Sequence, residues 1–320
     1  MAPKKVGILC GFEDTMPHAF INRVNELGKG EVVGEFVRVG APKMGEHSGY
    51  AVIVDRISHE IETYKPFLKN AVLTGTYVVN DPFWWSADDK FIDAGIVSKL
   101  GVPHPKTVVI PSKARFPRTT EKSYRNQMLV DWKEVFDYIG FPAIVKPYDG
   151  GGWRNVYKVN NFQEFFRAYE ETGTLVMIVQ ECIDFDDFYR CLTIGQNNVR
   201  VMRYNPKAYF HEQYGSGEVD QNDPLIAEII RHCKTINQAL GYDMNSQEFA
   251  CKDGIPYAID FMNAAPDMDY HSIRPDHFEW AINAMAEMCV QYALEGRSMP
   301  IRYEWQKMIA AQAPAQVVIK

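Results

Sequence analysis

The sequence has few of the features that mark membrane-spanning, disulfide-rich or nucleic-acid-binding proteins. No apolar run approaches the ~18 residues needed to cross a bilayer. The six cysteines are scattered and form no CxxC pair, so we expect free thiols in a reducing cytoplasm. A net charge of -7 lacks the basic surplus that is typical of a general nucleic-acid binder. We therefore expect a cytoplasmic globular protein with neither nucleic acid nor membrane among its partners.

The short motifs that identify nucleotide or metal sites are also missing. The chain contains neither GxGxxG nor GxxxxGK[ST], and the glycine pair in VGILCGF (residues 6 to 12) supports a dinucleotide enzyme only weakly. The same apolar run is too short and too interrupted by glycine for a signal peptide, and it predicts a first buried strand. The eight histidines show no metal-ligand spacing, so no zinc site is predicted.

The chain does contain a regular alternation of short apolar runs and helical segments in its first 85 residues. Residues 15 to 28 place apolar side chains at helical spacing, between the apolar runs VGILCG and EVVGEFVRV. YAVIVDR, a helical segment and AVLTGTYVVNDP follow. This βαβαβ pattern predicts a small parallel sheet flanked by helices. Residues 112 to 130 are basic and poorly periodic, which favours a mobile surface segment.

A lysine followed by a glycine run is the first chemical signal. In FPAIVKPYDGGG (residues 141 to 152), an apolar run leads into Lys146, and Gly150, Gly151 and Gly152 follow. A buried lysine is costly unless it meets an anion or water. Glycines let backbone N–H groups approach phosphate oxygens. The pattern predicts a phosphate clamp with a flexible lid, although a hairpin turn with a surface lysine fits this stretch equally well.

A hairpin near the C-terminus carries the second signal. Glu248 precedes the turn at Asp253-Gly254, and Asp260 and Asn263 follow it. Two carboxylates and an amide oxygen suit Mg²⁺. A two-residue turn would put Glu248 opposite Ile259, so a metal site requires a longer loop or a β-bulge. The alternative is that both carboxylates simply face water.

Six motifs in order resemble the ATP-grasp superfamily, in the carboxylate–amine ligase branch that includes glutathione synthetase, D-alanine–D-alanine ligase and a ribosomal-protein glutamate ligase. The motifs, between about residues 80 and 295, are VVNDP, ADDKFIDAGIVSKLGVPHPKT, FPAIVKP with its glycine loop, VQECI, DDFYRCLTIG with VRVMR, and QEFACKDGIPYAIDFMN. The resemblance implies an α/β protein with the ATP-grasp fold, in which two α+β subdomains clasp ATP. A small parallel-sheet domain precedes them in the chain. It divides the chain into the parallel-sheet domain (1–85), a linker helix with subdomain A (86–180), and subdomain B (181–320).

The resemblance also implies roles for individual residues. The phosphates of ATP would meet Lys90, Lys146 and the glycine lid. The adenine and ribose would be held by Gln180, Glu181, Ile183, Asp187 and, as second choice, Asp184. The γ-phosphate and the developing acyl phosphate would meet Arg190 and Arg203. Mg²⁺ would be held by Glu248, Asp260 and Asn263.

Two departures from the family pattern stand out. The last strand has Asp260-Phe-Met-Asn263 where the family has Glu-x-Asn. The shorter carboxylate of Asp260 is less able to bridge two metal ions. Positions three apart point to opposite faces of a regular strand, so the strand must bend or end at Phe261 for Asn263 to join the site. In addition, FHEQYGSGEVD (residues 210 to 220) occupies the loop over the active site and matches no family pattern.

The resemblance implies ADP-forming ligation of a carboxylate to an amine through an acyl phosphate, with ATP and Mg²⁺ and with small-molecule substrates such as an amino acid or a short peptide. A homo-oligomer is compatible with the sequence. The alternatives are a kinase of the same fold that acts on a hydroxyl, and a non-catalytic ATP-binding protein. Arg56 is the candidate for the substrate carboxylate, because it follows an apolar strand whose carboxyl end faces a cleft in parallel-sheet proteins. A surface salt bridge from Arg56 to Asp55 or Glu60 is its alternative role.

Overall fold

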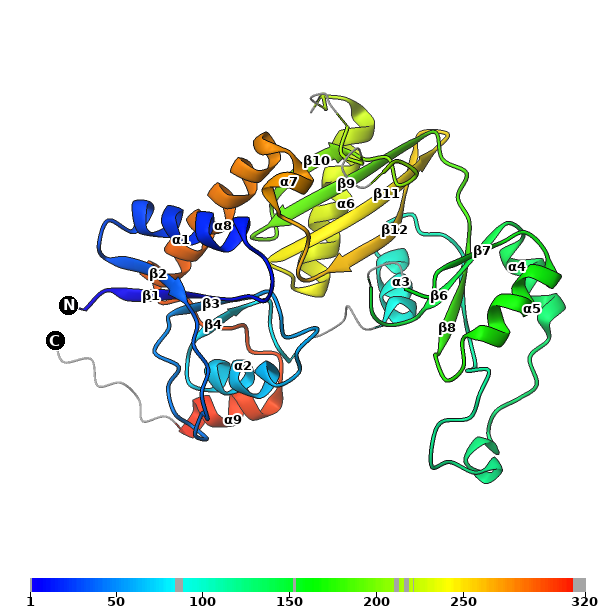
Figure 1. Cartoon of the computed structure of the whole chain (residues 1–320), viewed down its shortest axis with the longest axis horizontal. Coiled ribbons are helices and arrows are strands. Elements are labelled where there is room, and N and C mark those ends of the chain that lie inside the picture. The colour runs from blue at the N-terminus through cyan, green and yellow to red at the C-terminus, as the bar shows by residue number, and fades with distance from the viewer. Residues whose placement is uncertain are drawn as a thin grey trace.

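The computed structural model describes residues 2–83, 89–151, 154–209, 213–215, 219–220 and 222–312. These residues form three four-stranded sheets with helices packed against them (Figure 1). No helix in these ranges is long and apolar enough to cross a membrane. All six cysteines are free thiols, as expected.

The first sheet is parallel and has the order β2-β1-β3-β4. Its strands are β1 (Lys4–Leu9), β2 (Val32–Phe36), β3 (Val52–Asp55) and β4 (Tyr77–Val79). The helices α1 (Thr15–Gly28) and α2 (Tyr64–Leu73) connect them. Every residue of β3 is buried, as expected for a parallel strand that is covered on both faces. The alternating pattern of the first 85 residues therefore predicts this sheet correctly.

The second sheet is antiparallel and has the order β5-β8-β6-β7. Its strands are β5 (Thr107–Ile110), β6 (Ala143–Pro147), β7 (Tyr157–Val159) and β8 (Met177–Glu181). Its own core includes residues of α4 (Trp132–Ile139) and α5 (Phe162–Glu171). Among the described residues, its buried apolar side chains form a cluster separate from the clusters of the other two sheets.

The third sheet is antiparallel and has the order β10-β9-β11-β12. Its strands are β9 (Asp187–Ile194), β10 (Asn198–Arg203), β11 (Met244–Lys252) and β12 (Ile255–Asn263). One core on this sheet includes α6 (Pro224–Leu240) and residues of α3 (Lys90–Lys99). The short α7 (Tyr270–Ile273) leads into α8 (Pro275–Glu295), and α9 (Glu304–Gln312) ends the described chain.

The first and third sheets share one hydrophobic core. Residues of β1, β3 and β4 pack in the same cluster as residues of β9, β11 and α8. Asn80 adds a polar link, since its Oδ1 accepts from the backbone N–H groups of Asp243 (2.8 Å) and Met244 (3.0 Å) and its Nδ2 donates to the Met244 carbonyl (2.8 Å). The expected domain boundary at residue 85 stays a prediction, although residues on both sides of it pack in this one core.

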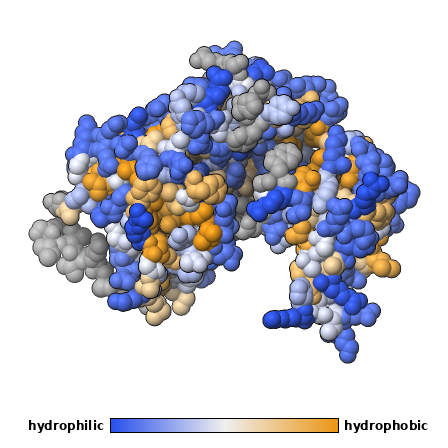
Figure 2. All heavy atoms as spheres, viewed as in Figure 1, coloured by the Kyte–Doolittle hydropathy of each residue, from blue (hydrophilic) through white to orange (hydrophobic). Residues whose placement is uncertain are grey.

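Residues 112 to 130 form an arm with defined internal contacts, and the mobility expected from the sequence stays a prediction. The backbone N–H of Phe116 donates to the Tyr124 hydroxyl (2.7 Å), and the arm includes the 3-10 helix η2 (Glu121–Tyr124). The arm extends from the second sheet as a largely hydrophilic protrusion (Figure 2).

Candidate active site

The β11–β12 hairpin brings Glu248 and Asp260 together through a bulge. Asp253 (φ 51°) and Gly254 (φ 76°) form the two-residue turn, because both adopt the left-handed conformation that this turn requires. The register pairs Phe249 with Ala258 and then Glu248 with Asp260, which leaves Ile259 as an extra residue. The bulge thus meets the condition set by the sequence pattern, and the two carboxylates are cross-strand neighbours.

A second irregularity brings Asn263 to the same face. Ser246 and Glu248 lie two residues apart on β11, so they share a face of the sheet. Their partners on β12 are Asn263 and Asp260, although these are three residues apart. The extra residue between them therefore resolves the conflict in strand geometry noted from the sequence.

Burial sets the electrostatics of this row of residues. Desolvation raises the pKa of Glu248 to about 7, Arg190 opposes this rise, and the neighbouring Asp260 adds to it. Arg190 is the cross-strand partner of Glu248 on β9, and its Nη1 lies 3.7 Å from Glu248 Oε1. Lys146 also opposes the rise, so the two carboxylates lie between two cationic side chains.

The donor set fits Mg²⁺, which prefers oxygen ligands. Among the described residues, no three His, Cys, Asp or Glu side chains are clustered as a metal site. Two carboxylates and the Asn263 amide could still hold an ion whose other ligands come from phosphates and water, as is usual for Mg²⁺. The residues present therefore fit this metal.

Lys146 lies directly beside the bulge. Its Nζ donates to the Ile259 carbonyl (3.0 Å), and burial lowers its pKa while Asp260 raises it. A small pocket at this point is lined by both lysines of the predicted phosphate site, Lys146 and Lys90, and by Gln180 and Asp260. The surface-lysine alternative for Lys146 is therefore wrong, since its half-buried side chain reaches from the second sheet to β12 of the third.

The glycine loop contacts the second lysine. Lys90 Nζ donates to the Gly150 carbonyl (2.7 Å), and the Lys90 N–H donates to the Tyr148 carbonyl (2.8 Å). Gly150 has φ +79°, a conformation that favours glycine. Gly151 is exposed, and Gly152 lies outside the described residues.

The residues predicted for adenine and ribose lie at the end of β8 and in the segment that leads from it to the third sheet. Gln180 is buried and lines the pocket, where its Nε2 donates to Thr107 Oγ1 (3.2 Å). Glu181 Oε2 accepts from the Lys106 N–H (3.3 Å). Ile183 is half-buried, and Asp184 is exposed. Of this group, only Gln180 lines the pocket.

Arg190 and Arg203 lie on opposite faces of the third sheet, which corrects their expected pairing at the phosphates. The register aligns Met202 with Arg190 and Arg203 with Tyr189, so Arg203 shares the face of Tyr189. Arg203 forms an ion pair with Asp187 (3.1 Å), which is itself the predicted ribose ligand. The reason is strand alternation: the register of β9 and β10 turns Arg203 away from Glu248.

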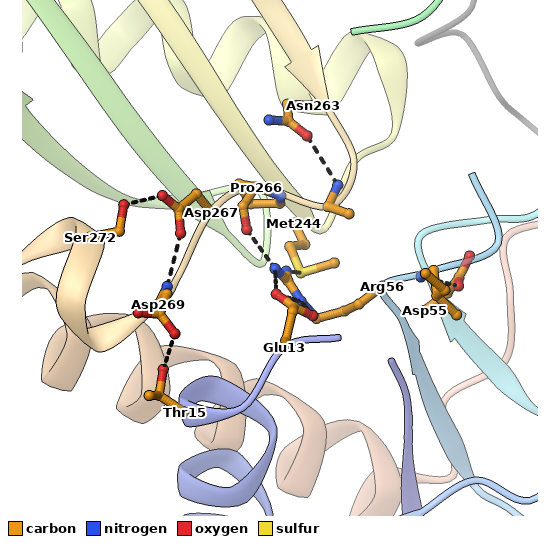
Figure 3. Close-up of polar contacts among 12 residues, drawn as sticks. Glu13, Thr15, Asp55, Arg56, Met244, Asn263, Pro266, Asp267, Asp269 and Ser272 are labelled. Carbon is orange, nitrogen blue, oxygen red and sulfur yellow. Dashed lines mark hydrogen bonds and ion pairs between the residues drawn. The ribbon is translucent and has the colours of Figure 1, made fainter. Parts of the chain in front are cut away.

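Arg56 is buried and its guanidinium is occupied, so it has no free edge for a substrate carboxylate. Its Nε lies 2.8 Å from Glu13 Oε2, and its Nη2 donates to the Pro266 carbonyl (2.6 Å) (Figure 3). Nη1 lies 3.4 Å from Met244 Sδ. The alternative, a surface salt bridge to Asp55 or Glu60, is also wrong, because the ion-pair partner of the buried Arg56 is Glu13.

Two residues near the site were missed by the sequence analysis. Glu13 follows β1 as Arg56 follows β3, so their common position at the carboxyl end of the first sheet was a usable signal. His104 lines the pocket with Lys146, and burial lowers its pKa to about 4, which keeps the imidazole neutral. The sequence gives no sign of the His104 position.

Comparison with known proteins adds an independent line of argument. No family model matches the chain. A D-alanine–D-alanine ligase of Ralstonia nicotianae is 24% identical over 57% of this chain and 63% of its own length. An L-arginine-specific L-amino acid ligase of Bacillus subtilis is 29% identical over 32% of this chain and 28% of its own. The match thus spans less than two thirds of these two relatives.

Solved structures match over almost the whole chain. The D-alanine–D-alanine ligase of Bacillus anthracis complexed with ATP has a TM-score of 0.64 at 17% identity, covering 91% of this chain and 98% of that one. A RimK domain ATP-grasp protein of Sphaerobacter thermophilus also has a TM-score of 0.64, at 15% identity, covering 91% and 99%. The ATP-grasp ligase PsnB complexed with its minimal precursor has a TM-score of 0.61 at 13% identity, covering 92% and 99%. The fold and the resemblance to ligases of this branch are confirmed.

Proposed function

We propose that this chain, which has the ATP-grasp fold, is an ADP-forming ligase that joins a carboxylate to an amine with ATP and Mg²⁺. The observation that carries the proposal is the row formed by Lys146, Asp260, Glu248 and Arg190. Lys146 contacts β12 at the bulge, and the other three residues are successive cross-strand neighbours. Positive groups thus flank a pair of carboxylates along one line.

Each part of this row has a role in phosphoryl transfer. Lys146 and Lys90 would bind phosphate oxygens, and Glu248, Asp260 and Asn263 would hold Mg²⁺. Bound Mg²⁺ neutralises phosphate charge during transfer. Gln180 would contact the adenine, with Glu181, Ile183 and Asp184 nearby. Gly150 to Gly152 would let the lid approach the phosphates and exclude water.

The proposed reaction has two steps. A carboxylate oxygen of the acid attacks the γ-phosphorus of ATP, which forms an acyl phosphate and releases ADP. The amine nitrogen then attacks the acyl carbon, phosphate leaves, and the nitrogen loses a proton. Arg190 would stabilise the negative charge that develops on the acyl and phosphoryl oxygens.

The relatives support an amino acid or a short peptide as substrate. The names of the first two curated relatives specify D-alanine and L-arginine substrates. Neither these comparisons nor the acidic net charge of -7 favours nucleic acid or a membrane as partner. We accordingly place the reaction in the cytoplasm, with small molecules as substrates.

The test is a screen for ADP release over amino acids, dipeptides and small acids, with mass spectrometry of the products. The proposal expects a condensed product that lacks one water relative to the acid and amine. A phosphorylated hydroxyl product would instead identify a kinase. Release of no ADP with any pair would support a non-catalytic ATP-binding protein and contradict the proposal.

A further inference from the structure

Two hydrogen-bond donors beside the candidate metal site have no partner among the residues that the structure describes. They are Arg190 Nε and the Tyr214 hydroxyl, both of which are buried, and no residue in the described part of the chain accepts from either. Tyr214 is only 7% exposed. Because buried polar groups are almost always hydrogen-bonded, unpaired donors in a candidate site point to a ligand that bears an acceptor.

The backbone fixes Tyr214 at this position. Residues 213 to 215 pair with the end of β10, since the Asn205 N–H donates to the Gln213 carbonyl (2.7 Å) and the Gly215 N–H donates to the Arg203 carbonyl (3.1 Å). Tyr214 is thereby bridged to Tyr204, and their rings pack edge to face at 5.2 Å. Tyr214 is thus held by strand-like pairing, although its loop matched no family pattern.

Arg190 is stacked on these two tyrosines. Its guanidinium carbon lies 5.4 Å from the Tyr204 ring centre and 5.9 Å from the Tyr214 ring centre, which is cation–π distance. The contact leaves Nε unpaired while Nη1 approaches Glu248. The strand order β10-β9-β11-β12 puts this group on the side of Glu248 that is opposite Asp260 and Lys146.

We propose that the Tyr214 hydroxyl and Arg190 Nε together bind the carboxylate of the acid substrate. The inference rests on the proposed ligase function and adds Tyr214 to its substrate-binding residues. A carboxylate offers acceptor lone pairs for two N–H or O–H donors, and here it would lie across the metal site from the phosphate-binding lysines. Burial raises the pKa of Tyr214, so the hydroxyl keeps its proton and can donate.

A neighbouring charge restricts the ligand further. Asp267 is close enough to affect the pKa of both Tyr214 and Arg190. Its Oδ1 accepts from the Asp269 N–H (3.0 Å) and its Oδ2 from Ser272 Oγ (Figure 3). Within the described part of the chain, neither oxygen accepts a hydrogen bond from the Tyr214 hydroxyl. Its negative charge favours a ligand with one carboxylate over a dianion at this position.

The experiment measures binding of sodium propionate, a minimal carboxylate, to protein saturated with ADP and Mg²⁺, by saturation-transfer NMR. Tyr214→Phe keeps the ring and removes one donor to a charged acceptor, so the propionate Kd should rise tenfold or more. ADP affinity should stay within twofold of the wild type. The ligand-free thermal midpoint should not fall, because the hydroxyl bonds to no residue in the described part of the chain. If the hydroxyl had a structural role instead, Tyr214→Phe would lower the thermal midpoint and leave the propionate Kd unchanged.

Tyr189→Phe is the matched control, since this tyrosine lies on the other face of β9, and its propionate Kd should change less than twofold. Arg190→Lys, which keeps the charge and loses Nε–H, should also weaken the binding of propionate. Equal binding by wild type and Tyr214→Phe, or no binding by the wild type, would overturn the assignment. Failure of the ligase function would show separately, as absence of ADP release in the substrate screen while propionate binding still depends on Tyr214.

Discussion

Glu248 and Asp260 face each other across the β11–β12 hairpin only because Ile259 is an extra residue in β12. With a regular register, the two-residue turn would place Asp260 on the opposite face. The same bulge presents the Ile259 carbonyl to Lys146 Nζ. One irregularity therefore determines both the carboxylate pair and its contact with the phosphate-binding lysine.

Asp260→Asn should suppress Mg²⁺-dependent turnover by a factor of about 10² or more, because it removes one charge from the pair with little change in shape. ATP affinity measured without metal should change much less. The matched control is Asp253→Asn at the turn of the same hairpin, where asparagine also tolerates the positive φ. Activity that is insensitive to chelators would contradict the metal assignment.

Lys146→Ala should weaken ATP binding by about 10- to 100-fold, the range expected for loss of a charge-assisted hydrogen bond. Titration calorimetry with ATP measures this directly. Lys158→Ala removes an exposed lysine of the adjacent strand β7 and should leave affinity unchanged. If both variants bind ATP as the wild type does, Lys146 is not part of the phosphate site.

Arg190→Gln and Arg203→Gln should behave differently, although both arginines were predicted to contact phosphate. Arg190 adjoins Glu248, so its loss should lower kcat by about 10²-fold or more. Arg203 is exposed on the other face, so its loss should change kcat less than about threefold. Steady-state ADP release distinguishes them, and a large defect in both would refute the face assignment.

Glu13→Gln should destabilise the protein by about 2–4 kcal/mol, because it leaves the buried Arg56 without its counter-charge. Urea denaturation measures the loss. Glu62→Gln is the control: Glu62 is 82% exposed in its ion pair with Lys65, and breaking such a pair costs about 1 kcal/mol or less. Equal stability of the two variants would show that the Glu13–Arg56 pair contributes no more than a surface contact.

Asp93→Asn should stabilise the protein above pH 7 and have little effect near pH 4. Burial raises the folded-state pKa of Asp93 to about 8, Asp89 adds to the rise, and Lys90 opposes it. The unfolded value is about 3.9. Between these values the folded state binds more protons, so stability falls as pH rises. The calorimetric melting midpoint should fall less between pH 5 and pH 8 in Asp93→Asn than in the wild type. The exposed control Glu171→Gln should show the same fall as the wild type. An unchanged slope would contradict the burial argument.

The sequence predicted the fold better than the contacts within the site. Lys146 could be placed because an apolar strand, a lysine and a glycine run are consecutive in the chain. The pairing of Glu248 with Asp260 could only be stated as a condition, since turn length and bulges decide register. Arg56 was assigned wrongly because its partner, Glu13, is 43 residues away and its other contacts come from β11 and from the segment after β12. Local patterns carry no information about such distant neighbours.

The core shared by the first and third sheets limits how the protein can be recombined. A chimera that replaced the first 80 residues with those of a relative would change one side of this core and keep the other. The side chains of α8 would then pack against residues from a different protein. Asn80 would also have to match the backbone at Asp243 and Met244. The second sheet, with its own core, is the natural module for exchange. Exchange of the first sheet therefore requires exchange of the residues on β9, β11 and α8 that pack against it.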